Sequence, residues 1–504
     1  MDILSNLMQG FEVAVTPMNL LFVTIGAFVG MIVGMLPGFG PSAGIAILLP
    51  LTFSLNPTSA IIMLAGIYYG SQYGGTITSI LINTPGDSST VASTFDGYPL
   101  ARQGRVGPAL VMQAIASFVG GTVGVILISS LAPAFAEVAS SFGPPEFLML
   151  MLMGMLMLVW MTGESKVRGI LSALLGLAIA TVGVDVVSGI PRYTFGSPEL
   201  INGIDFIPVA IGIFGIGELF YSVYTGAHKE KVETISFSYT KSKFLPSFKE
   251  VLQTKFTLIR NSILGFVIGV LPGAGATVAS LFGYSIEKKL SKEPDKFGKG
   301  AMKGLVAPET ANNAATSGAM IPLMTLGIPG SASTAVLLAA FLMWGLQPGP
   351  LLIESNPEFS WGMITSMYLG NMILLLVNIV AIPLFVKILQ VPYRYLVPFI
   401  LILCIVGTYS LNGSIIETWL LLGFGVLGFF MKIGDYSPAA LVLALVLGPL
   451  AENTFRQSLI ISGGDLSIFI TRPVSLSFLI FIILVMFVPL IQKGYRFTKG
   501  VKNI

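Results

Sequence analysis

Charged residues are scarce in this 504-residue sequence: Asp, Glu, Lys and Arg make up 10% of it, against about 25% in ordinary soluble domains. No charged residue or histidine occurs between Glu12 and Asp87, a stretch of 74 residues. A membrane-spanning helix needs about 20 predominantly apolar residues, so this stretch can hold several crossings. The scarcity of charge therefore predicts an all-α polytopic membrane protein.

Cysteine and histidine are almost absent, with Cys404 and His228 the single residues of each kind. One cysteine cannot build a disulfide framework, and no Cys/His cluster has metal-ligand spacing. A net charge of +3 is too small to indicate a nucleic-acid partner. The pattern GxxxxGK[ST] is missing, which argues against direct coupling to ATP. We expect no cofactor, and no ion beyond a coupling ion such as Na⁺ or H⁺.

An intramembrane hydrolase is a rival class for such a sequence. A Ser/His site within the membrane is disfavoured because His228 begins a basic polar stretch. An aspartyl site of the GxGD type is disfavoured because "SGGD" and "KIGD" both lack the first glycine. We therefore expect no enzyme activity.

Basic residues gather at about 224–256, at 287–303 and at the end of the chain, whereas the other connections are acidic or neutral. Loops rich in Lys and Arg face the cytoplasm, so the pattern predicts an N-terminus outside and a C-terminus inside. The sequence is thereby divided into five parts: an N-terminal surface segment (1–17), transmembrane repeat 1 (18–223), a basic cytoplasmic linker (224–256), transmembrane repeat 2 (257–470), and a last transmembrane helix with a basic tail (471–504).

The stretch "GMLPGFGP" at 34–41 interrupts an apolar segment. Pro and Gly end a helix, and a bilayer tolerates a broken helix only where protein or water satisfies the freed backbone groups. The pattern returns as "GVLPGAGA" at 269–276, 235 residues further on. We expect both stretches to be tips of re-entrant helical hairpins.

A second motif is also repeated in the same order. "SQYGGTITSILINTPGDSST", which starts at Ser71, aligns with "ATSGAMIPLMTLGIPGSAST", which starts at Ala315. Two ordered matches indicate an internal duplication. Since the charge pattern places the start of the first copy outside and that of the second inside, the sequence predicts two inverted-topology repeats with broken helices.

The two tips and the two Pro-Gly breaks predict an anion site near mid-membrane. Half-helix N-termini present unpaired N–H groups and positive dipole ends to an anion. The hydroxyl residues after each break would add hydrogen bonds, although they equally fit caps of their own helices. The candidate substrate-binding residues here are Gly38, Gly40, Ser42, Asn83, Thr84, Gly86, Ser88, Ser89, Gly273, Gly275, Thr277, Gly330, Ser331, Ser333 and Thr334.

Glu309 is the single charged residue between Lys303 and Glu354. An isolated carboxylate at membrane depth is costly, which makes it a functional hypothesis: a cation ligand, a proton carrier or the partner of a distant arginine. The alternative is a place at the membrane edge, close to Lys303. The candidate cation-coupling residues are Glu309, Asn312, Asn313 and Thr316.

Arg456 and Asp465, in "ENTFRQSLIISGGD", form another polar group in an apolar context. Arginine is the natural bidentate partner of a carboxylate. Arg456 is therefore a further candidate for substrate binding, and a surface loop is the equal alternative.

Four long stretches resemble the large membrane subunit of tripartite tricarboxylate transporters, the TctA family. They are "LPGFGPSAGIAILLPLTF", "GIYYGSQYGGTITSILINTPGDSSTVASTFDGYPLARQGRVGPAL", "VAPETANNAATSGAMIPLMTLGIPGSAS" and "ENTFRQSLIISGGDLSIFITRP". The similarity extends over about residues 18–492, nearly the whole chain.

The resemblance implies a multi-pass subunit of the bacterial inner membrane that imports organic di- and tricarboxylates such as citrate. It further implies transport driven by an ion gradient. Unwound carbonyls and helix C-termini at the breaks suit Na⁺, so we expect Na⁺ rather than H⁺, and the duplicated hairpins favour alternating access by an elevator-type symporter. The implied partners are a small TctB-like membrane subunit and a TctC-like periplasmic protein that delivers the substrate. A carboxylate channel remains an alternative, and the sequence does not distinguish between carboxylates.

Overall fold

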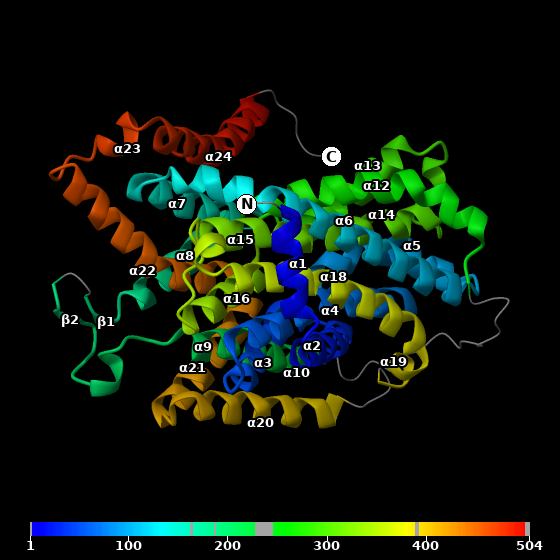
Figure 1. Ribbon diagram of the computed structural model, residues 1–504, viewed down its shortest axis with the longest axis horizontal. Helices are drawn as coiled ribbons and strands as arrows, with labels where there is room; N and C mark the ends of the chain where they lie inside the picture. Colours follow the sequence, from blue (N-terminus) through cyan, green and yellow to red (C-terminus); the bar gives the residue numbers. More distant parts are fainter. Residues whose placement is uncertain (1–2, 162–164, 186–187, 227–244, 389–392, 499–504) are drawn as a thin grey trace.

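The computed structural model describes residues 3–161, 165–185, 188–226, 245–388 and 393–498. These residues confirm the predicted all-helical fold, because their regular structure is helical apart from one short hairpin (Figure 1). In this hairpin β1 (Gly183–Val184) pairs antiparallel with β2 (Pro191–Arg192). Most of the predicted basic linker, at 227–244, and the end of the basic tail lie outside the described residues.

The helices follow one another closely along the chain. The first half contains α1 (Ile3–Ala14), α2 (Pro17–Met35), α3 (Gly40–Leu48), η1 (Leu49–Thr52), α4 (Pro57–Ile82), η2 (Ser88–Thr90), α5 (Val91–Arg102), α6 (Val106–Ser140), α7 (Pro144–Met161), α8 (Lys166–Ala180), η3 (Pro198–Leu200), α9 (Phe206–Ala210), η4 (Ile211–Ile216) and α10 (Gly217–Thr225). The second half contains α12 (Phe248–Val270), α13 (Gly275–Leu290), η5 (Pro294–Lys296), α14 (Met302–Gly318), α15 (Met320–Leu326), α16 (Ala332–Met343), α17 (Leu352–Ser355), α18 (Pro357–Val380), α19 (Ile382–Ile388), α20 (Tyr393–Asn412), α21 (Ile415–Ile433), α22 (Pro438–Ile461), α23 (Ile468–Thr471) and α24 (Pro473–Thr498).

Seven helical spans among the described residues are long and apolar enough to cross a membrane. They are Pro17–Met35, Val106–Ser140, Phe206–Thr225, Pro357–Val380, Tyr395–Asn412, Ile415–Ile433 and Pro438–Ile461. Four shorter apolar helices accompany them: Gly40–Thr52, Pro144–Trp160, Ala332–Met343 and Pro473–Met486. The chain is therefore a multi-pass membrane protein.

Local sequence signals set the ends of several helices. The side chain of Asn56 caps α4 by accepting a 2.8 Å hydrogen bond from the Ser59 N–H, and Pro57 occupies the first helical position, where no backbone donor is lost. The same helix ends at Asn83, whose φ of 56° lies in the left-handed region. Asn favours this region more than most residues do, so Asn83 serves as the terminator of α4.

Small residues allow the two closest helix pairs to form. A Cβ on Gly34 of α2 would collide with the Ser71 carbonyl of α4, and a Cβ on Gly269 of α12 would collide with the Ala315 carbonyl of α14. Helices in membranes associate through such close backbone approaches, because lipid offers little hydrophobic drive for association. The GxxxG spacing that precedes each predicted tip therefore has a packing role.

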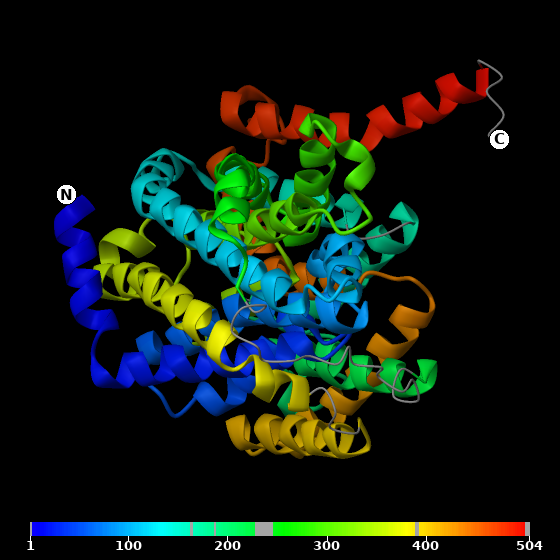
Figure 2. The same ribbon diagram turned by 90° about the vertical axis from the view of Figure 1, so that its right-hand side faces the viewer.

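The two halves of the chain are interleaved. In the first half α7 and α8 pack against α22 of the second half, while α21 of the second half packs against η4 and α10 of the first. Helices α20 and α24 lie on opposite sides of this body in both views (Figures 1 and 2). The N-terminal helix α1 packs against α18, with Gly10 buried against the Trp361 carbonyl.

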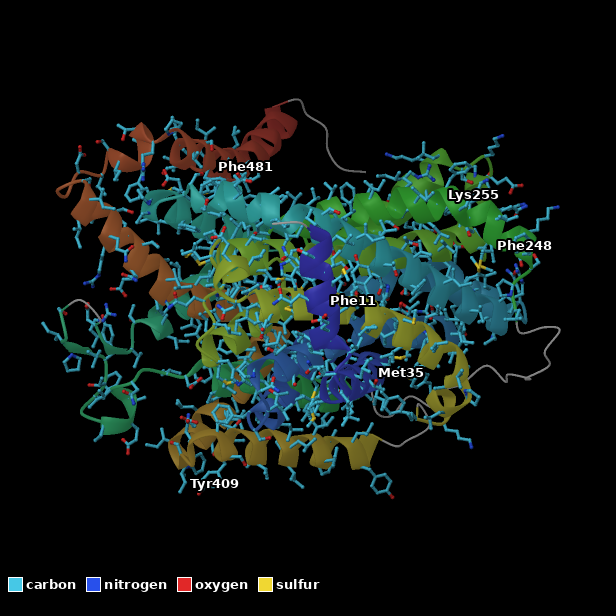
Figure 3. All side chains as sticks on the ribbon, in the orientation of Figure 1. Phe11, Met35, Phe248, Lys255, Tyr409 and Phe481 are labelled. Atoms are coloured by element: carbon cyan, nitrogen blue, oxygen red, sulfur yellow. The ribbon has the colours of Figure 1, made fainter. Side chains whose placement is uncertain are left out.

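Large apolar side chains remain exposed on the outer helices. Phe248 of α12 is 77% exposed, and Tyr409 of α20 and Phe481 of α24 are also exposed at the periphery (Figure 3). An apolar exterior of this kind is expected where helices face lipid rather than water.

Candidate functional site

The loop between α2 and α3 and the loop between α12 and α13 adopt the same backbone conformation. We name them loop 1 (residues 36–40) and loop 2 (residues 271–275). The φ angle is 87° at Gly38 and 82° at Gly273, and it is 59° at Gly40 and 60° at Gly275. Residues with a Cβ are strained at positive φ, so glycine fits all four positions.

Each loop is hydrogen-bonded to the Pro-Gly break of its own half of the chain. We name these segments break 1 (residues 85–90) and break 2 (residues 329–334). The Gly38 N–H donates to the Gly86 carbonyl at 3.2 Å, and the Gly273 N–H donates to the Gly330 carbonyl at 3.0 Å. The structure therefore brings together, within each half, the two features that the sequence singled out.

Both breaks begin a helix with a capping box. In break 1 the Asp87 side chain accepts from backbone N–H groups, and the Thr90 side chain reaches back to the Asp87 N–H. In break 2 Ser331 and Thr334 form the same arrangement, with the Thr334 hydroxyl accepting from the Ser331 N–H at 2.8 Å. The capping alternative is thus confirmed for these residues, and a ligand-binding role for them stays a prediction.

The loops and breaks of the two halves also contact one another. The hydroxyls of Ser88 in break 1 and Thr277 near loop 2 lie 2.8 Å apart. The Tyr68 hydroxyl of α4 lies 3.4 Å from the Ser331 hydroxyl of break 2 and also interacts with Thr316. The candidate substrate residues from both halves therefore converge in one region, to which Thr316 and the unforeseen Tyr68 also belong.

Charge is distributed unequally over this region. A Cβ on Gly40 would lie 3.0 Å from the Asp87 carboxylate, and a Cβ on Gly38 would lie 2.5 Å from the Glu218 carboxylate. Glu218 in turn forms an ion pair with Lys432 at the end of α21. Loop 1 is therefore bordered by two carboxylates and one ammonium group, whereas a Cβ on Gly273 in loop 2 would meet the backbone of α7.

The remaining candidates near the breaks play local roles. Ser42 is half-buried in the first turn of α3, Thr84 donates to the Ile82 carbonyl at 3.3 Å, and Ser333 is 5% exposed in the first turn of α16. The Ser89 hydroxyl contacts the side-chain oxygens of Asp87 at 2.9 Å and of Gln72 at 2.7 Å.

Glu309 lies in the interior of the protein and is 0% exposed. Burial does not fix its depth in the membrane, so a position at the membrane edge stays an alternative. Its side chain is surrounded by neutral hydrogen-bonding groups. The contacts to Oε2 come from Thr76 at 2.6 Å and Ser93 at 3.2 Å, and those to Oε1 come from Ser117 at 2.7 Å, Asn313 at 3.1 Å and Gln113 at 3.5 Å.

No ion pair joins Glu309 to a basic side chain of the described residues, so the option of a distant arginine partner is wrong for these residues. Asn313 lies beside the carboxylate as predicted. Asn312 is fully buried and accepts from Asn313 at 2.5 Å, while its own Nδ2 has no hydrogen-bond partner. The described residues contain no group of three or more His, Cys, Asp or Glu that could hold a metal ion.

Arg456 lies apart from the loops, in a network of four charged side chains. Its guanidinium donates to both oxygens of Asp185, at 3.2 and 2.6 Å, and to Glu452 at 2.7 Å. Arg192 of the β-hairpin donates to both oxygens of Glu452, at 2.8 and 3.1 Å. Asp465 instead bonds to Ser467 in its own loop, so the two residues that are close in sequence do not pair.

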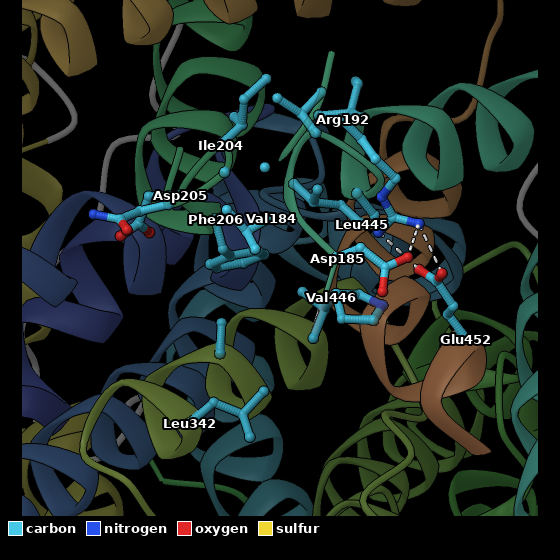
Figure 4. A pocket seen from close by; sticks show the side chains of 18 of the residues that line it. Val184, Asp185, Arg192, Ile204, Asp205, Phe206, Leu342, Leu445, Val446 and Glu452 are labelled. Atoms are coloured by element: carbon cyan, nitrogen blue, oxygen red, sulfur yellow. Dashed lines mark hydrogen bonds and ion pairs between the residues drawn. The ribbon is translucent and has the colours of Figure 1, made fainter. Parts of the chain in front are cut away.

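This network lines one end of a cavity of about 550 Å³ (Figure 4). The other walls are largely apolar and include Phe206 of α9 and Leu342 near the end of α16. The hydrogen bond with Glu452 raises the pKa of the Arg192 guanidinium, so this residue is charged at all physiological pH values. The cavity therefore has a charge-paired end and a larger part that is mostly apolar but also lined by Asn202, Asp205 and Asn453, and α16 connects it with break 2.

The sequence analysis did not predict most of the residues that contact Glu309 and Arg456. Thr76, Ser93, Gln113 and Ser117 are polar residues in apolar helices, and that pattern could have marked them as buried contacts. Asp185, Arg192 and Glu452 carry no such local signal, because the first two belong to the short β-hairpin and Glu452 lies inside α22, far away in the sequence.

The structure has long apolar helices, exposed apolar side chains and two glycine loops that are hydrogen-bonded to helix breaks. These features define a multi-pass membrane protein of the transporter class. The chain belongs to the tripartite tricarboxylate transporter TctA family, whose model matches residues 20–443. The predicted resemblance is thereby confirmed. The family is a transporter family without catalytic function, and it implies a tripartite system with TctB and TctC partners.

Two relatives come from Agrobacterium vitis. An uncharacterised 52.8 kDa protein of the TAR-I ttuC′ 3′ region is 42% identical over 479 residues, which cover 95% of this chain and 94% of the relative. An uncharacterised protein of the TAR-II ttuC′ 3′ region is 45% identical over 215 residues, which cover 43% of this chain and 89% of the relative. No solved structure matches the chain.

Proposed function

We propose that this chain is the large subunit of a bacterial inner-membrane system that imports organic di- or tricarboxylates by using an ion gradient. A TctB-like membrane subunit accompanies it, and a TctC-like periplasmic protein delivers the substrate. The observation that carries this proposal is the convergence of both loops and both breaks, through the hydrogen bonds of Gly38 and Gly273 to the breaks and the contact of Ser88 with Thr277.

The substrate site of this proposal lies where the two halves meet. Helix α16 starts at break 2 with hydroxyl side chains and with backbone N–H groups of its first turn, which favour an anion. Ser331, Ser333 and Thr334 lie at this helix start, and Tyr68 reaches it from the other half. A carboxylate held there would gain hydrogen bonds without facing a carboxylate on the break itself.

We further propose that the two halves are inverted repeats whose loops are tips of re-entrant hairpins. The matched φ angles and the matched hydrogen bonds of the loops support this relation. Inverted repeats with broken helices allow alternating access by movement of one bundle against the other, which favours a symporter of the elevator type over a channel. Arg456 takes a separate place in this proposal, as a candidate on the substrate path at the far end of α16.

Glu309 is the proposed coupling residue. Thr76 connects it with α4 and Ser93 connects it with α5, the helix that follows break 1. A change in the charge state of Glu309 would therefore act on the elements that position break 1.

The test is uptake of labelled citrate and other carboxylates into proteoliposomes that contain this chain and its co-expressed partner subunits. We expect accumulation above the external concentration when an inward ion gradient is present. Equilibration without accumulation would favour the channel, and absence of carboxylate uptake under every ion gradient would refute the proposed function.

A further inference from the structure

We propose that Glu309 is protonated in this conformation and that its proton is the ion that moves with the carboxylate substrate. This inference rests on the proposed function and deepens it, because it names the coupled ion at the predicted coupling residue. It departs from the expectation of Na⁺ that the helix breaks suggested.

The first support is the lack of a compensating charge. Glu309 is 0% exposed, and none of the five side chains that contact its carboxylate among the described residues is cationic. An ionised carboxylate buried without a partner loses its hydration, and such a group neutralises itself unless a cation is bound. A proton on Glu309 removes the need for a counter-ion.

The second support comes from counting protons on Ser117. Its hydroxyl carries one proton, yet it lies 2.9 Å from the Gln113 carbonyl and 2.7 Å from Glu309 Oε1. If the hydroxyl donates to the carbonyl, the shorter contact to Oε1 needs a proton from Glu309. Protonated Glu309 can donate to Ser117 and still accept from Thr76 and Ser93 on its other oxygen. With the proton on Glu309, the contacts of Ser117, Thr76 and Ser93 with its carboxyl group are all hydrogen bonds.

The third support distinguishes a proton from a sodium ion. Asn313 turns its Nδ2 toward Glu309: this nitrogen lies 3.0 Å from the Glu309 carbonyl and 3.1 Å from Oε1, and it also contacts Asn312 Oδ1 at 2.5 Å. An amide N–H cannot ligate a cation, so this side of the carboxylate is built for a hydrogen-bonded group. A sodium ion would require Asn313 to rearrange, whereas a proton requires no change.

Several other titratable groups on the helices around α14 have partners of their own, whereas the buried Tyr69 hydroxyl of α4 has no hydrogen-bond partner among the described residues. Tyr73 of α4 donates to Asn371 at 2.6 Å. On α5, Asp96 accepts from Tyr284 of α13 and from three backbone N–H groups of the loop before α14. Arg260 of α12 is paired with Glu287 of α13, and Arg105 at the start of α6 is paired with Glu250 of α12. The other basic residues of these helices are exposed: Lys249, Lys255, Lys288, Lys289 and Arg102.

The coupling follows from the contacts of Glu309 with α4 and α5. Loss of the proton leaves Glu309 negatively charged, and the hydroxyls of Thr76 on α4 and Ser93 on α5 then bind its carboxylate more strongly. Both α4 and α5 therefore favour a different position. Since α4 also carries Tyr68, whose hydroxyl lies 3.4 Å from the Ser331 hydroxyl of break 2, the affinity for substrate at break 2 and the affinity for the proton depend on each other, and this dependence is reciprocal.

The experiment uses the reconstituted complex in three settings: an inward proton gradient without Na⁺, an inward Na⁺ gradient without a pH difference, and exchange of internal for external carboxylate without any gradient. We expect the wild type to accumulate substrate with the proton gradient alone. Glu309→Gln keeps the shape of the protonated acid, so it should retain exchange but lose proton-driven accumulation by tenfold or more. Glu309→Asp, which can still carry a proton, should retain part of the proton-driven accumulation.

The matched control is Glu287→Gln, which removes another buried carboxylate that already has Arg260 as its partner. Its accumulation, relative to its exchange rate, should respond to the proton gradient as the wild type does. A wild-type measurement covers the case in which Glu309→Gln does not fold: a pH-sensitive dye trapped in the vesicles should report acidification when carboxylate enters.

Two results would overturn the inference while leaving carboxylate transport intact. One is proton-driven accumulation by Glu309→Gln at the wild-type level. The other is wild-type uptake that follows the Na⁺ gradient alone, without acidification of the vesicles. Failure of the proposed function is a separate outcome, because then neither gradient nor exchange would move carboxylate in any variant.

Discussion

Break 1 and break 2 share one backbone design but differ in their surroundings. In both, a Pro-Gly pair precedes a capping box and the glycine carbonyl accepts from a loop glycine. Break 1 starts its helix with Asp87, and break 2 starts its helix with Ser331 in the equivalent position. The two breaks thus share a backbone geometry and differ in the charge of the capping side chain.

The space around the two glycines differs as well. A Cβ on Gly86 would collide with the Gly34 carbonyl and with Gly75, whereas a Cβ on Gly330 would meet its nearest neighbours, Ala319 and Gly269, at 3.3 Å. Break 1 is therefore locked by backbone packing and bears a negative charge. Break 2 is neutral and less tightly enclosed, which makes it the better place for an anionic substrate.

The largest expected effect comes from placing a methyl group at each break. Gly86→Ala should abolish folded protein and uptake, because the Cβ has only backbone atoms to displace. Gly330→Ala should keep folded protein, since shifts of a few tenths of an ångström accommodate the new atom. The check is the yield of monodisperse protein after extraction, followed by uptake. Equal yields of the two variants would contradict the difference in packing.

The second prediction concerns a negative charge added to break 2. In Ser331→Asp the helix cap is retained, because Asp caps as well as Ser does, but a negative charge now faces the substrate. We expect KM for the carboxylate to rise about tenfold, which corresponds to ~1.4 kcal/mol, at an unchanged yield of folded protein. Ser331→Asn is the matched control because it caps without the charge. A KM that stays constant in Ser331→Asp would place the substrate elsewhere.

The third prediction removes the charge of break 1. Asp87→Asn also preserves the cap, and it takes away a negative charge near the meeting point of the two halves. We expect KM to fall about two- to threefold, less than in the reverse change at break 2, because Glu218 and Lys432 also act on this region and screen the effect. A rise of KM would mean that Asp87 holds the coupled cation.

The smallest expected effect concerns the contact between the halves. Ser88 and Thr277 form a hydroxyl pair at 2.8 Å that is exposed to solvent, and neutral hydrogen bonds in such places contribute about 1 kcal/mol or less. A double-mutant cycle with Ser88→Ala and Thr277→Val should give a coupling of about 0.5 kcal/mol in thermal unfolding of the complex. Strict additivity would show that this contact does not join the halves.

The conformation of the repeated motifs could be predicted from the sequence because it depends on residues that are close together in the chain. Positive φ at Gly38 and Gly273, and the capping boxes of the breaks, depend on residues within a few positions of each other. Such conformations demand particular residue types, chiefly glycine, proline and short hydroxyl residues. The pattern of these residues therefore predicted both loops and both helix starts.

The residues that contact Glu309 and Arg456 could not be predicted from the sequence in this way. Glu309 receives contacts from α4, α5 and α6, which precede it by about 190 to 230 residues. Arg456 pairs with Asp185 across 271 residues, whereas the nearby Asp465 has no bond to it among the described residues. Side chains of this kind meet only when distant helices pack, and several packings would satisfy the same local preferences.

By itself the sequence determined the membrane class, the helix breaks and the family resemblance, because composition, short-range backbone preferences and long motifs suffice for these, and it predicted the duplication. Only the tertiary structure decided that the breaks meet, that loop 1 is bordered by charge, that Glu309 is sealed among neutral donors and that Arg456 belongs to a separate cavity. The physical reason is that burial and electrostatic compensation are properties of neighbours in space. In a chain with so few charges, the position of each one relative to its neighbours is fixed by helix packing.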